Sequence, residues 1–142
     1  MEIKSCCVIG GGRMGRQIAL NSAIYGFKSV LYDLSEAVCA DAEKWAEEYL
    51  AERIAKGRMT EEKVAEIKSL FSVERDLAKA VDGVDCVIEA IIEVEDVKHK
   101  LFKQLSDILP EDTIIATNSS AMVSSMFAGD VKNPARLCNM HY

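Results

Sequence analysis

The stretch Gly10–Gly15 (GGGRMG) most restricts what this chain can fold into. It follows the apolar run Ile3–Ile9, which is typical of a buried strand, and it opens a helical pattern that extends from Arg13 to about Tyr25. Its first, third and sixth residues satisfy the spacing G-x-G-x-x-G. In a strand–turn–helix unit this spacing lets the backbone come close to the pyrophosphate of a dinucleotide.

The glycines of this turn have separate tasks. Gly10 is needed for the tight turn, Gly12 for close approach of a pyrophosphate, and Gly15 for packing of the helix on the strand. Arg13 and Arg16 lie in the first turn of the helix, where the helix dipole disfavours positive charge. A bound pyrophosphate would reverse that penalty; the alternative is two solvated arginines tolerated at modest cost. The residues expected to bind the cofactor here are Gly10, Gly11, Gly12, Arg13, Met14 and Gly15.

Asp33 ends the second predicted strand, Ser29–Asp33, 23 positions after Gly10. A carboxylate at this place can accept both hydroxyls of an adenosine ribose and would repel a 2′-phosphate. No arginine immediately follows it, so the sequence favours NAD over NADP as the cofactor. The alternative is a simple turn aspartate.

Strand and helix patterns alternate along the rest of the chain. Ser35 is a candidate cap for a long helix through Lys56, and Thr60 is a candidate cap for the next helix. The long helix offers one apolar stripe of Val38, Trp45, Tyr49 and Ile54. The remaining predicted elements are helices at Glu61–Leu70, Asp76–Val81 and Val97–Leu109 and strands at Leu70–Val73, Asp85–Ile92, Thr113–Thr117 and Leu137–His141. The alternation predicts an α/β fold of Rossmann type, a doubly wound and mainly parallel sheet with a helical hairpin inserted at about residues 35–70.

The composition argues against several classes of protein. With 23 acidic and 17 basic residues the net charge is −6, which disfavours nucleic-acid binding because phosphate contacts need clustered bases. No apolar run is long enough to span a membrane, and strand-like sequence follows Met1 directly, so we expect neither a membrane span nor a signal peptide. The five cysteines form no C-x-x-C pair and the two histidines are far apart, which predicts a cytoplasmic protein without a metal site.

Three further segments carry motifs: Val87–Leu105 (VIEAIIEVEDVKHKLFKQL), Thr117–Met122 (TNSSAM) and the closing Met140–Tyr142 (MHY). They resemble, in this order, the V-I-E-A-x-x-E…K…L-F segment, the T-N-T-S loop and the start of the H-F-x-N-P strand of the 3-hydroxyacyl-CoA dehydrogenase family. The acidic helix and the KGRMTEEKVAEIKSLF segment after it also resemble that family's helical hairpin. The resemblance covers essentially the whole chain and implies that residues 1–142 are an NAD-binding domain.

The first motif implies a set of cofactor contacts. By resemblance, Glu93 and Lys98 line the nicotinamide–ribose side of the NAD cleft, with Ile92 beside them. Independently, Glu93 follows the carboxyl end of a predicted buried strand, where ligands of such sheets bind. The alternative for Glu93 and Lys98 is an exposed ion pair at a helix start.

The second motif and the hairpin imply contacts to substrate. Ser120 corresponds to the family's serine that holds the substrate's 3-oxygen beside the nicotinamide, with Asn118 in the same loop. Ser119 departs from the family's usual threonine but keeps a hydroxyl. The structural alternatives are a turn former for Asn118 and a helix N-cap for Ser120. Lys56, at the end of the long helix, is the residue we expect to contact the CoA portion of an acyl-CoA; the alternative is a solvated turn.

His141 lies 21 positions after Ser120 and resembles the family's catalytic base. A histidine suits proton removal from a 3-hydroxyl because its pKa lies near working pH. The glutamate that orients this base in the family, the asparagine of its H-F-x-N-P strand and its helical C-terminal domain would all lie beyond Tyr142. The chain is therefore expected to be an incomplete fragment, inactive alone, with His141 at a frayed end.

The function implied by the resemblance is NAD-dependent interconversion of (S)-3-hydroxyacyl-CoA and 3-oxoacyl-CoA, as in fatty-acid β-oxidation or butyrate-type metabolism. The whole protein would then be a homo-oligomer, as members of that family are. Two alternatives stay open: an NAD-dependent dehydrogenase of a free hydroxy acid, and an NAD-binding module without catalysis.

Overall fold

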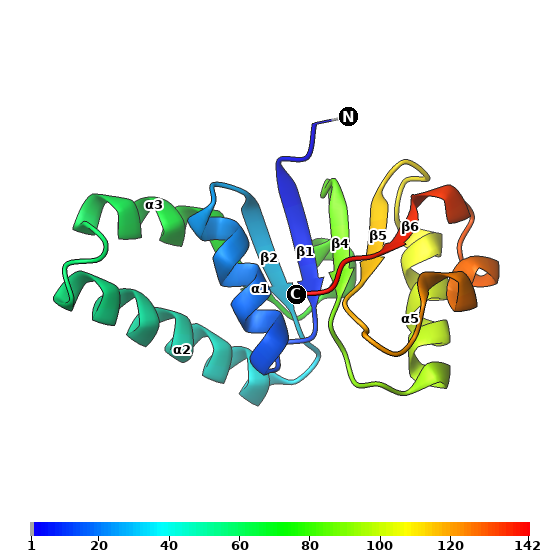
Figure 1. Cartoon of the computed structure of the whole chain (residues 1–142), viewed down its shortest axis with the longest axis horizontal. Coiled ribbons are helices and arrows are strands. Elements are labelled where there is room, and N and C mark those ends of the chain that lie inside the picture. The colour runs from blue at the N-terminus through cyan, green and yellow to red at the C-terminus, as the bar shows by residue number, and fades with distance from the viewer. Residues whose placement is uncertain (1) are drawn as a thin grey trace.

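Six of the apolar runs form one parallel sheet in the computed structural model, which describes residues 2–142. The strand order is β3-β2-β1-β4-β5-β6, and every strand pair in this sheet is parallel (Figure 1). The strands are β1 (Ser5–Ile9), β2 (Lys28–Tyr32), β3 (Phe71–Glu74), β4 (Cys86–Glu89), β5 (Ile114–Thr117) and β6 (Leu137–Asn139). This is the order of the Rossmann fold, so the predicted fold class is confirmed.

The helices alternate with these strands as predicted. They are α1 (Arg13–Ile24), α2 (Glu36–Ala55), α3 (Glu61–Leu70), α4 (Leu77–Ala80) and α5 (Glu95–Ile108), followed by the 3₁₀ segments η1 (Ser124–Asp130) and η2 (Pro134–Arg136). Ser35 caps α2 by accepting from the N–H of Val38, and Thr60 caps α3 by accepting from the N–H of Lys63. Together α2 and α3 form the predicted hairpin, which extends to the left of the sheet in Figure 1.

The two faces of the sheet build two cores. Alternate strand residues such as Cys7 and Val87 pack against α4 and α5, and their neighbours such as Val8 and Ile88 pack against α1 and α2. This alternation follows from the strand period of two residues. A third cluster joins α1 to the hairpin, so the hairpin is fixed to the body of the domain.

The buried stripe of α2 differs from the one predicted. In α2 the small or medium side chains Cys39, Ala42, Ala46 and Leu50 face the core. Trp45 and Tyr49 are only half-buried: they pack against the edge of the third cluster and line an open groove. In α5 the core side is formed by Phe102 and Leu105, whereas Ile108 is 42% exposed.

The strand boundaries also differ in a way that affects the site. β4 ends at Glu89 and not at Ile92, and β6 ends at Asn139 and not at His141. The loops that follow these strands therefore begin earlier than predicted. Loops after the carboxyl ends of β1 and β4, where the strand order reverses, are the usual place of a ligand in such a sheet. None of the helices described in residues 2–142 has the length and apolar character needed to cross a membrane.

His99 joins α5 to η1. Its Nδ1 contacts the Asp130 carboxylate, its Nε2 lies 3.5 Å from Glu95 Oε1, and its ring packs edge-on against Phe127 at 4.9 Å between centroids. Lys103 Nζ lies 3.9 Å from the other Asp130 oxygen. The hydrogen bond with Asp130 raises the pKa of His99 above its ordinary value of 6.5, although partial burial opposes the shift.

This pKa shift predicts a pH-dependent stability. Because the folded pKa lies above the unfolded one, the charged contact stabilises the fold fully below about pH 6.5 and is lost as the pH rises through the folded pKa. We expect His99→Gln to lower the thermal midpoint more at about pH 5.5 than at about pH 9. Asp130→Asn should show the same trend. A midpoint difference that does not vary with pH would contradict this prediction.

Candidate functional site

The glycine turn after β1 is packed so closely that side chains are excluded at two of its positions. Gly10 has φ +110°, and a Cβ there would lie 2.5 Å from the carbonyl oxygen of Ala90 at the end of β4. A Cβ on Gly15 would lie 1.7 Å from the carbonyl oxygen of Gly10. These contacts bring the N-terminus of α1 directly against the carboxyl ends of β1 and β4, as predicted for Gly15.

The N-terminus of α1 is suited to hold an anion. α2, α3 and α4 each begin with a side chain that accepts a backbone N–H, whereas Gly12, the residue before α1, provides no such cap. A Cβ built on Gly12 would meet nothing within 4 Å, so open space lies above the turn. Free N–H groups at a helix N-terminus with space above them fit a pyrophosphate.

Asp33 directly follows β2 and lies beside the glycine turn. Its Oδ2 accepts a hydrogen bond from the N–H of Gly11 and its Oδ1 accepts one from the N–H of Ser35, each at 2.8 Å. The two bonds fix the carboxylate, and each oxygen keeps a further lone pair for an outside donor. This geometry fits an adenosine ribose whose two hydroxyls donate to Asp33.

Arg16 does not face the turn as we expected. Its Nη1 pairs with Asp41 Oδ2 of α2 at 2.7 Å, and its guanidinium lies 5.0 Å from the ring centroid of Trp45. The charge of Arg16 is therefore already compensated by α2 and gives no support for a bound pyrophosphate. Arg13 is exposed at the start of α1.

A cavity of about 260 Å³ opens beside the glycine turn at the carboxyl edge of the sheet. Its walls come from four segments: the first turn of α1, the loop after β4, the loop after β5 and the residues after β6. The residues that line it are Met14, Ala90, Ile91, Glu93, Asn118, Ser119, Ser120 and His141.

His141 is held in this wall by its two neighbours. The N–H of Met140 donates to the carbonyl oxygen of Thr117 at 2.9 Å, and the N–H of Tyr142 donates to Asn118 Oδ1 at 3.1 Å. The backbone on both sides of His141 is therefore bound to the loop after β5. The expectation of a frayed end is wrong, because these two bonds continue the contact between β5 and β6 beyond the strand.

Glu93 is anchored in the wall by two donors. Lys98 Nζ donates to its Oε1 at 2.8 Å, and Ser119 Oγ donates to its Oε2 at 2.5 Å. These bonds, first that of Lys98, hold the pKa of Glu93 below its ordinary value of 4.5. Half of the Glu93 side chain stays exposed, so an ionised carboxylate faces the cavity at neutral pH.

Lys98 is completely buried beneath the cavity, which rules out the exposed ion pair considered as an alternative. It also donates to both carboxylate oxygens of Glu89, each at 3.0 Å. Glu89, the last residue of β4, is equally buried and also accepts from Thr117 Oγ1 at 2.6 Å. Glu89 is a site residue that we did not predict, although a charged residue inside the apolar run Asp85–Ile92 is a signal for it.

A profile described as the NAD-binding domain of 3-hydroxyacyl-CoA dehydrogenase matches residues 5–142. The chain belongs to the 3-hydroxyacyl-CoA dehydrogenase family. A probable 3-hydroxybutyryl-CoA dehydrogenase of Bacillus subtilis (strain 168) is 35% identical over all 142 residues, which make up 49% of that protein. The chain thus spans about half the length of this curated relative.

Solved structures agree with this assignment. The 3-hydroxybutyryl-CoA dehydrogenase of Escherichia coli K12 is 32% identical with a TM-score of 0.95, over 100% of this chain and 30% of that one. The (S)-3-hydroxybutyryl-CoA dehydrogenase of Ralstonia eutropha is 29% identical with a TM-score of 0.93, over 99% of this chain and 50% of that one. The cofactor of the family is NAD, as predicted.

Within this NAD-binding domain, most of the predicted site residues come together. The cavity is lined by Met14, Glu93, Asn118, Ser120 and His141, and Asp33 and the glycines lie at the adjoining turn. Ile92 does not line the cavity and its side chain is 66% exposed, because the loop after β4 turns it outward. Lys56 directly follows the last residue of α2, so it lies at the C-terminal end of that helix and away from the cavity. Ser119, and not Ser120, accepts backbone N–H groups in its loop, from Ala121 and Met122.

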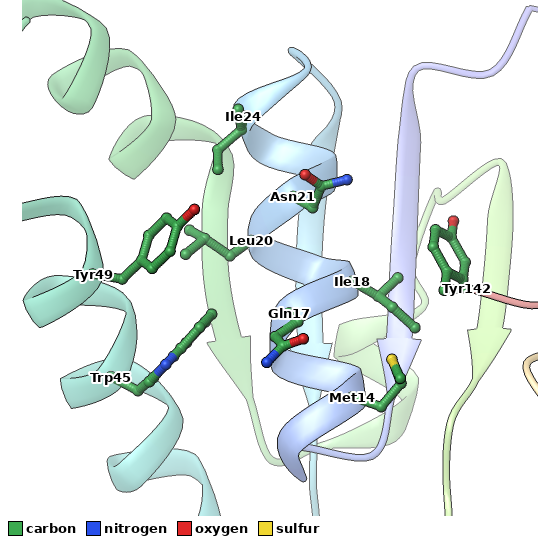
Figure 2. A pocket seen from close by; sticks show the side chains of 9 residues that line it. All are labelled: Met14, Gln17, Ile18, Leu20, Asn21, Ile24, Trp45, Tyr49 and Tyr142. Carbon is green, nitrogen blue, oxygen red and sulfur yellow. The ribbon is translucent and has the colours of Figure 1, made fainter. Parts of the chain in front are cut away.

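A larger groove of about 510 Å³ lies next to this cavity (Figure 2). Met14 lines both, and Tyr142 forms one end of the groove. Figure 2 shows the exposed side of α1 along the floor, with Trp45 and Tyr49 of α2 on one side and Tyr142 on the other. The groove therefore leads from the surroundings of His141 to the hairpin.

The fixed carboxylate of Asp33 predicts a preference between cofactors. We expect NAD(H) to bind at least about tenfold more tightly than NADP(H), because a 2′-phosphate would lie against Asp33. Titration calorimetry with both cofactors measures the ratio. Asp33→Asn should reduce this ratio mainly by increasing the affinity for NADP, because the repelling charge is gone, and to a smaller extent by lowering the affinity for NAD. Equal affinities for the two cofactors in the unmodified domain would show that Asp33 is a turn residue only.

Proposed function

We propose that this chain is the NAD-binding part of an enzyme that interconverts (S)-3-hydroxyacyl-CoA and 3-oxoacyl-CoA by hydride transfer. The observation that carries the proposal is the cavity in which Ser120, Asn118 and His141 lie beside the glycine turn. It combines a candidate base and two polar side chains with the place where a dinucleotide would end. Relatives named as 3-hydroxybutyryl-CoA dehydrogenases support a short-chain substrate.

The residues of the cavity can be given separate roles in this reaction. When bound, the nicotinamide ring supplies the hydride acceptor. The His141 imidazole removes the proton of the substrate's 3-hydroxyl as the hydride leaves C3, and returns it in the reverse direction. The Ser120 hydroxyl holds the 3-oxygen. Because Asn118 Oδ1 accepts from Tyr142, the amide nitrogen of Asn118 is the end left to donate to substrate.

A direct test uses the longest protein that contains this chain. It should oxidise (S)-3-hydroxybutyryl-CoA with NAD, and His141→Gln should lower kcat about 10²–10⁴-fold while the affinity for NAD changes little. Turnover of free 3-hydroxybutyrate in preference to the CoA thioester would favour the free hydroxy acid instead. Binding of NAD without any turnover would favour a non-catalytic module.

We also propose that the acyl-CoA substrate lies along the groove of Figure 2. The groove shares Met14 with the cavity that contains His141, follows α1 from Met14 to Ile24, and has Trp45 and Tyr49 of α2, the helix that Lys56 follows, as aromatic walls. Lys56 is exposed, and among residues 2–142 its ammonium pairs with Glu52 of its own helix alone. Because such an exposed ion pair is weak, a phosphate can replace Glu52 as the partner.

The role of Lys56 predicts a specific effect on substrate affinity. Lys56→Ala in the longer protein should raise KM for the acyl-CoA by about three- to tenfold at low salt, with kcat unchanged, and the difference should shrink as salt is added. Lys44→Ala, on the same helix, is the matched control. A KM that stays the same at every salt concentration would assign Lys56 to a solvated turn.

The compartment and assembly belong to the same proposal. All five cysteines are free, and burial raises the pKa of Cys86 to about 12, which makes it unreactive. Free thiols of this kind support a cytoplasmic protein. The net charge of −6 supports a protein that does not bind nucleic acid. We further propose a homo-oligomer for the whole protein, which light scattering would test.

A further inference from the structure

Glu89 is a buried carboxylate to which the proposed reaction gives no role. It accepts four hydrogen bonds: one from the N–H of Ile91 at 2.8 Å, two from Lys98 Nζ and one from Thr117 Oγ1. No part of its side chain is exposed. A carboxylate with all its acceptor positions occupied by donors is fixed in orientation, and it also fixes those donors.

The four bonds connect three segments that form the cavity wall. Ile91 belongs to the loop after β4, and Lys98 belongs to α5. Thr117 ends β5, and its Oγ1 accepts in turn from the N–H of Ser119 at 3.2 Å. The backbone carbonyl of Glu89 also accepts from the N–H of Asn118 at 2.8 Å. One side chain thus holds the β4 loop, the β5 loop and the start of α5 in a single arrangement.

Lys98 transmits this arrangement to the cavity. Its three ammonium protons meet three carboxylate oxygens, two of Glu89 and one of Glu93. The buried Glu89 therefore sets the position of Lys98. The half-exposed Glu93 is in turn held by Lys98 and Ser119. Without Glu89, the ammonium would have only a partner that can move toward solvent.

We propose that Glu89 is a positioning residue that, through Lys98 and Thr117, holds Glu93 and the Thr117–Ser120 loop in the geometry that receives the nicotinamide half of the dinucleotide. This inference rests on the proposed function, because it assigns the nicotinamide to the cavity beside His141. The proposed role is distinct from an effect of the Glu89 charge on Glu93. If Glu89 lost only its charge, the Lys98 ammonium would interact more strongly with Glu93, and Glu93 would be held at least as firmly as before.

The test compares NAD with ADP, which lacks the nicotinamide riboside, in titration calorimetry of the 142-residue chain. Glu89→Gln keeps the size of the side chain but turns an NH₂ group toward donors that need an acceptor. We expect the Kd for NAD to rise at least about tenfold and the Kd for ADP to stay within about twofold. Glu111 is an exposed glutamate in the loop before β5, at the opposite end of the strands from the cavity. Glu111→Gln is therefore the control for loss of one negative charge, and it should change neither Kd.

A second pair of variants keeps the proposal testable if the Glu89→Gln protein fails to fold. Thr117→Val removes the hydroxyl that donates to Glu89 and should weaken NAD selectively, whereas Thr117→Ser keeps it and should retain most of the affinity. Equal weakening of NAD and ADP by Glu89→Gln, or no weakening of either, would overturn the positioning role. If the unmodified chain binds ADP but gains nothing from the nicotinamide half of NAD, both the inference and the proposed function fail.

Discussion

Gly15→Ala is expected to lower the free energy of unfolding by about 3 kcal/mol or more and the thermal midpoint by about 10 °C. The added Cβ would lie 1.7 Å from the carbonyl oxygen of Gly10. Both groups belong to the backbone at the junction of β1 and α1, so no change of rotamer relieves the overlap. The helix must move off the strand, and the cavity wall formed by Met14 moves with it.

Gly12→Ala is the matched variant in the same turn, and it should separate binding from stability. Gly12 has φ −65°, which alanine adopts freely, and a Cβ there meets nothing within 4 Å. We expect the thermal midpoint to change by less than about 3 °C. The affinity for NAD and NADP should fall together by at least about tenfold, because the methyl group fills the space above the helix N-terminus.

Circular dichroism melts of the two variants measure the change in thermal midpoint, and calorimetric titrations measure the change in affinity for NAD and NADP. A Gly15→Ala protein as stable as the unmodified one would show that α1 can shift without loss. A Gly12→Ala protein that binds NAD normally would show that the dinucleotide does not approach this turn.

Lys98→Met is expected to lower the free energy of unfolding by about 3–5 kcal/mol. Methionine fills a similar volume, so the loss comes from leaving the fully buried Glu89 without its counter-ion. Lys100→Met, two positions away on the exposed side of α5, should change the stability by less than about 0.5 kcal/mol.

A double variant isolates the cause of this loss. Lys98→Met combined with Glu89→Gln removes the buried charge together with its partner, so it should recover at least about half of the stability lost in the single variant. Chemical denaturation of the single and double variants measures the difference. If the double variant is the less stable of the two, the loss arises from packing and not from an unpaired carboxylate.

Most of the fold could be predicted because its signals are local. Each strand is a short apolar run between polar or glycine residues, and the caps Ser35 and Thr60 mark the helix starts within a few positions. The strand ends were less certain. Asp85–Ile92 continues as an apolar run beyond Glu89, but the side chain of Glu89 itself binds the N–H of Ile91 and turns the chain there.

The site could be predicted only as a set of positions. Local spacing and motif placed Gly10–Gly15, Asp33, Ser120 and His141 at the ends of strands, and parallel strands bring those ends to one edge. The contacts among them depend on partners far away in sequence. Arg16 meets Asp41, and Tyr142 meets Asn118, for reasons that no local pattern contains.

The sequence by itself determined the order of elements, the glycine turn and the family, because these depend on residue type and short spacing. The tertiary structure decided the environment of each charge. A lysine in the first turns of a polar helix is ordinarily solvated, yet Lys98 is fully buried, since Glu89 and Glu93 reach it from β4 and from the loop after β4. Burial is set by what the rest of the chain places around a residue, so only the folded arrangement shows that these three charges form one unit beneath the cavity.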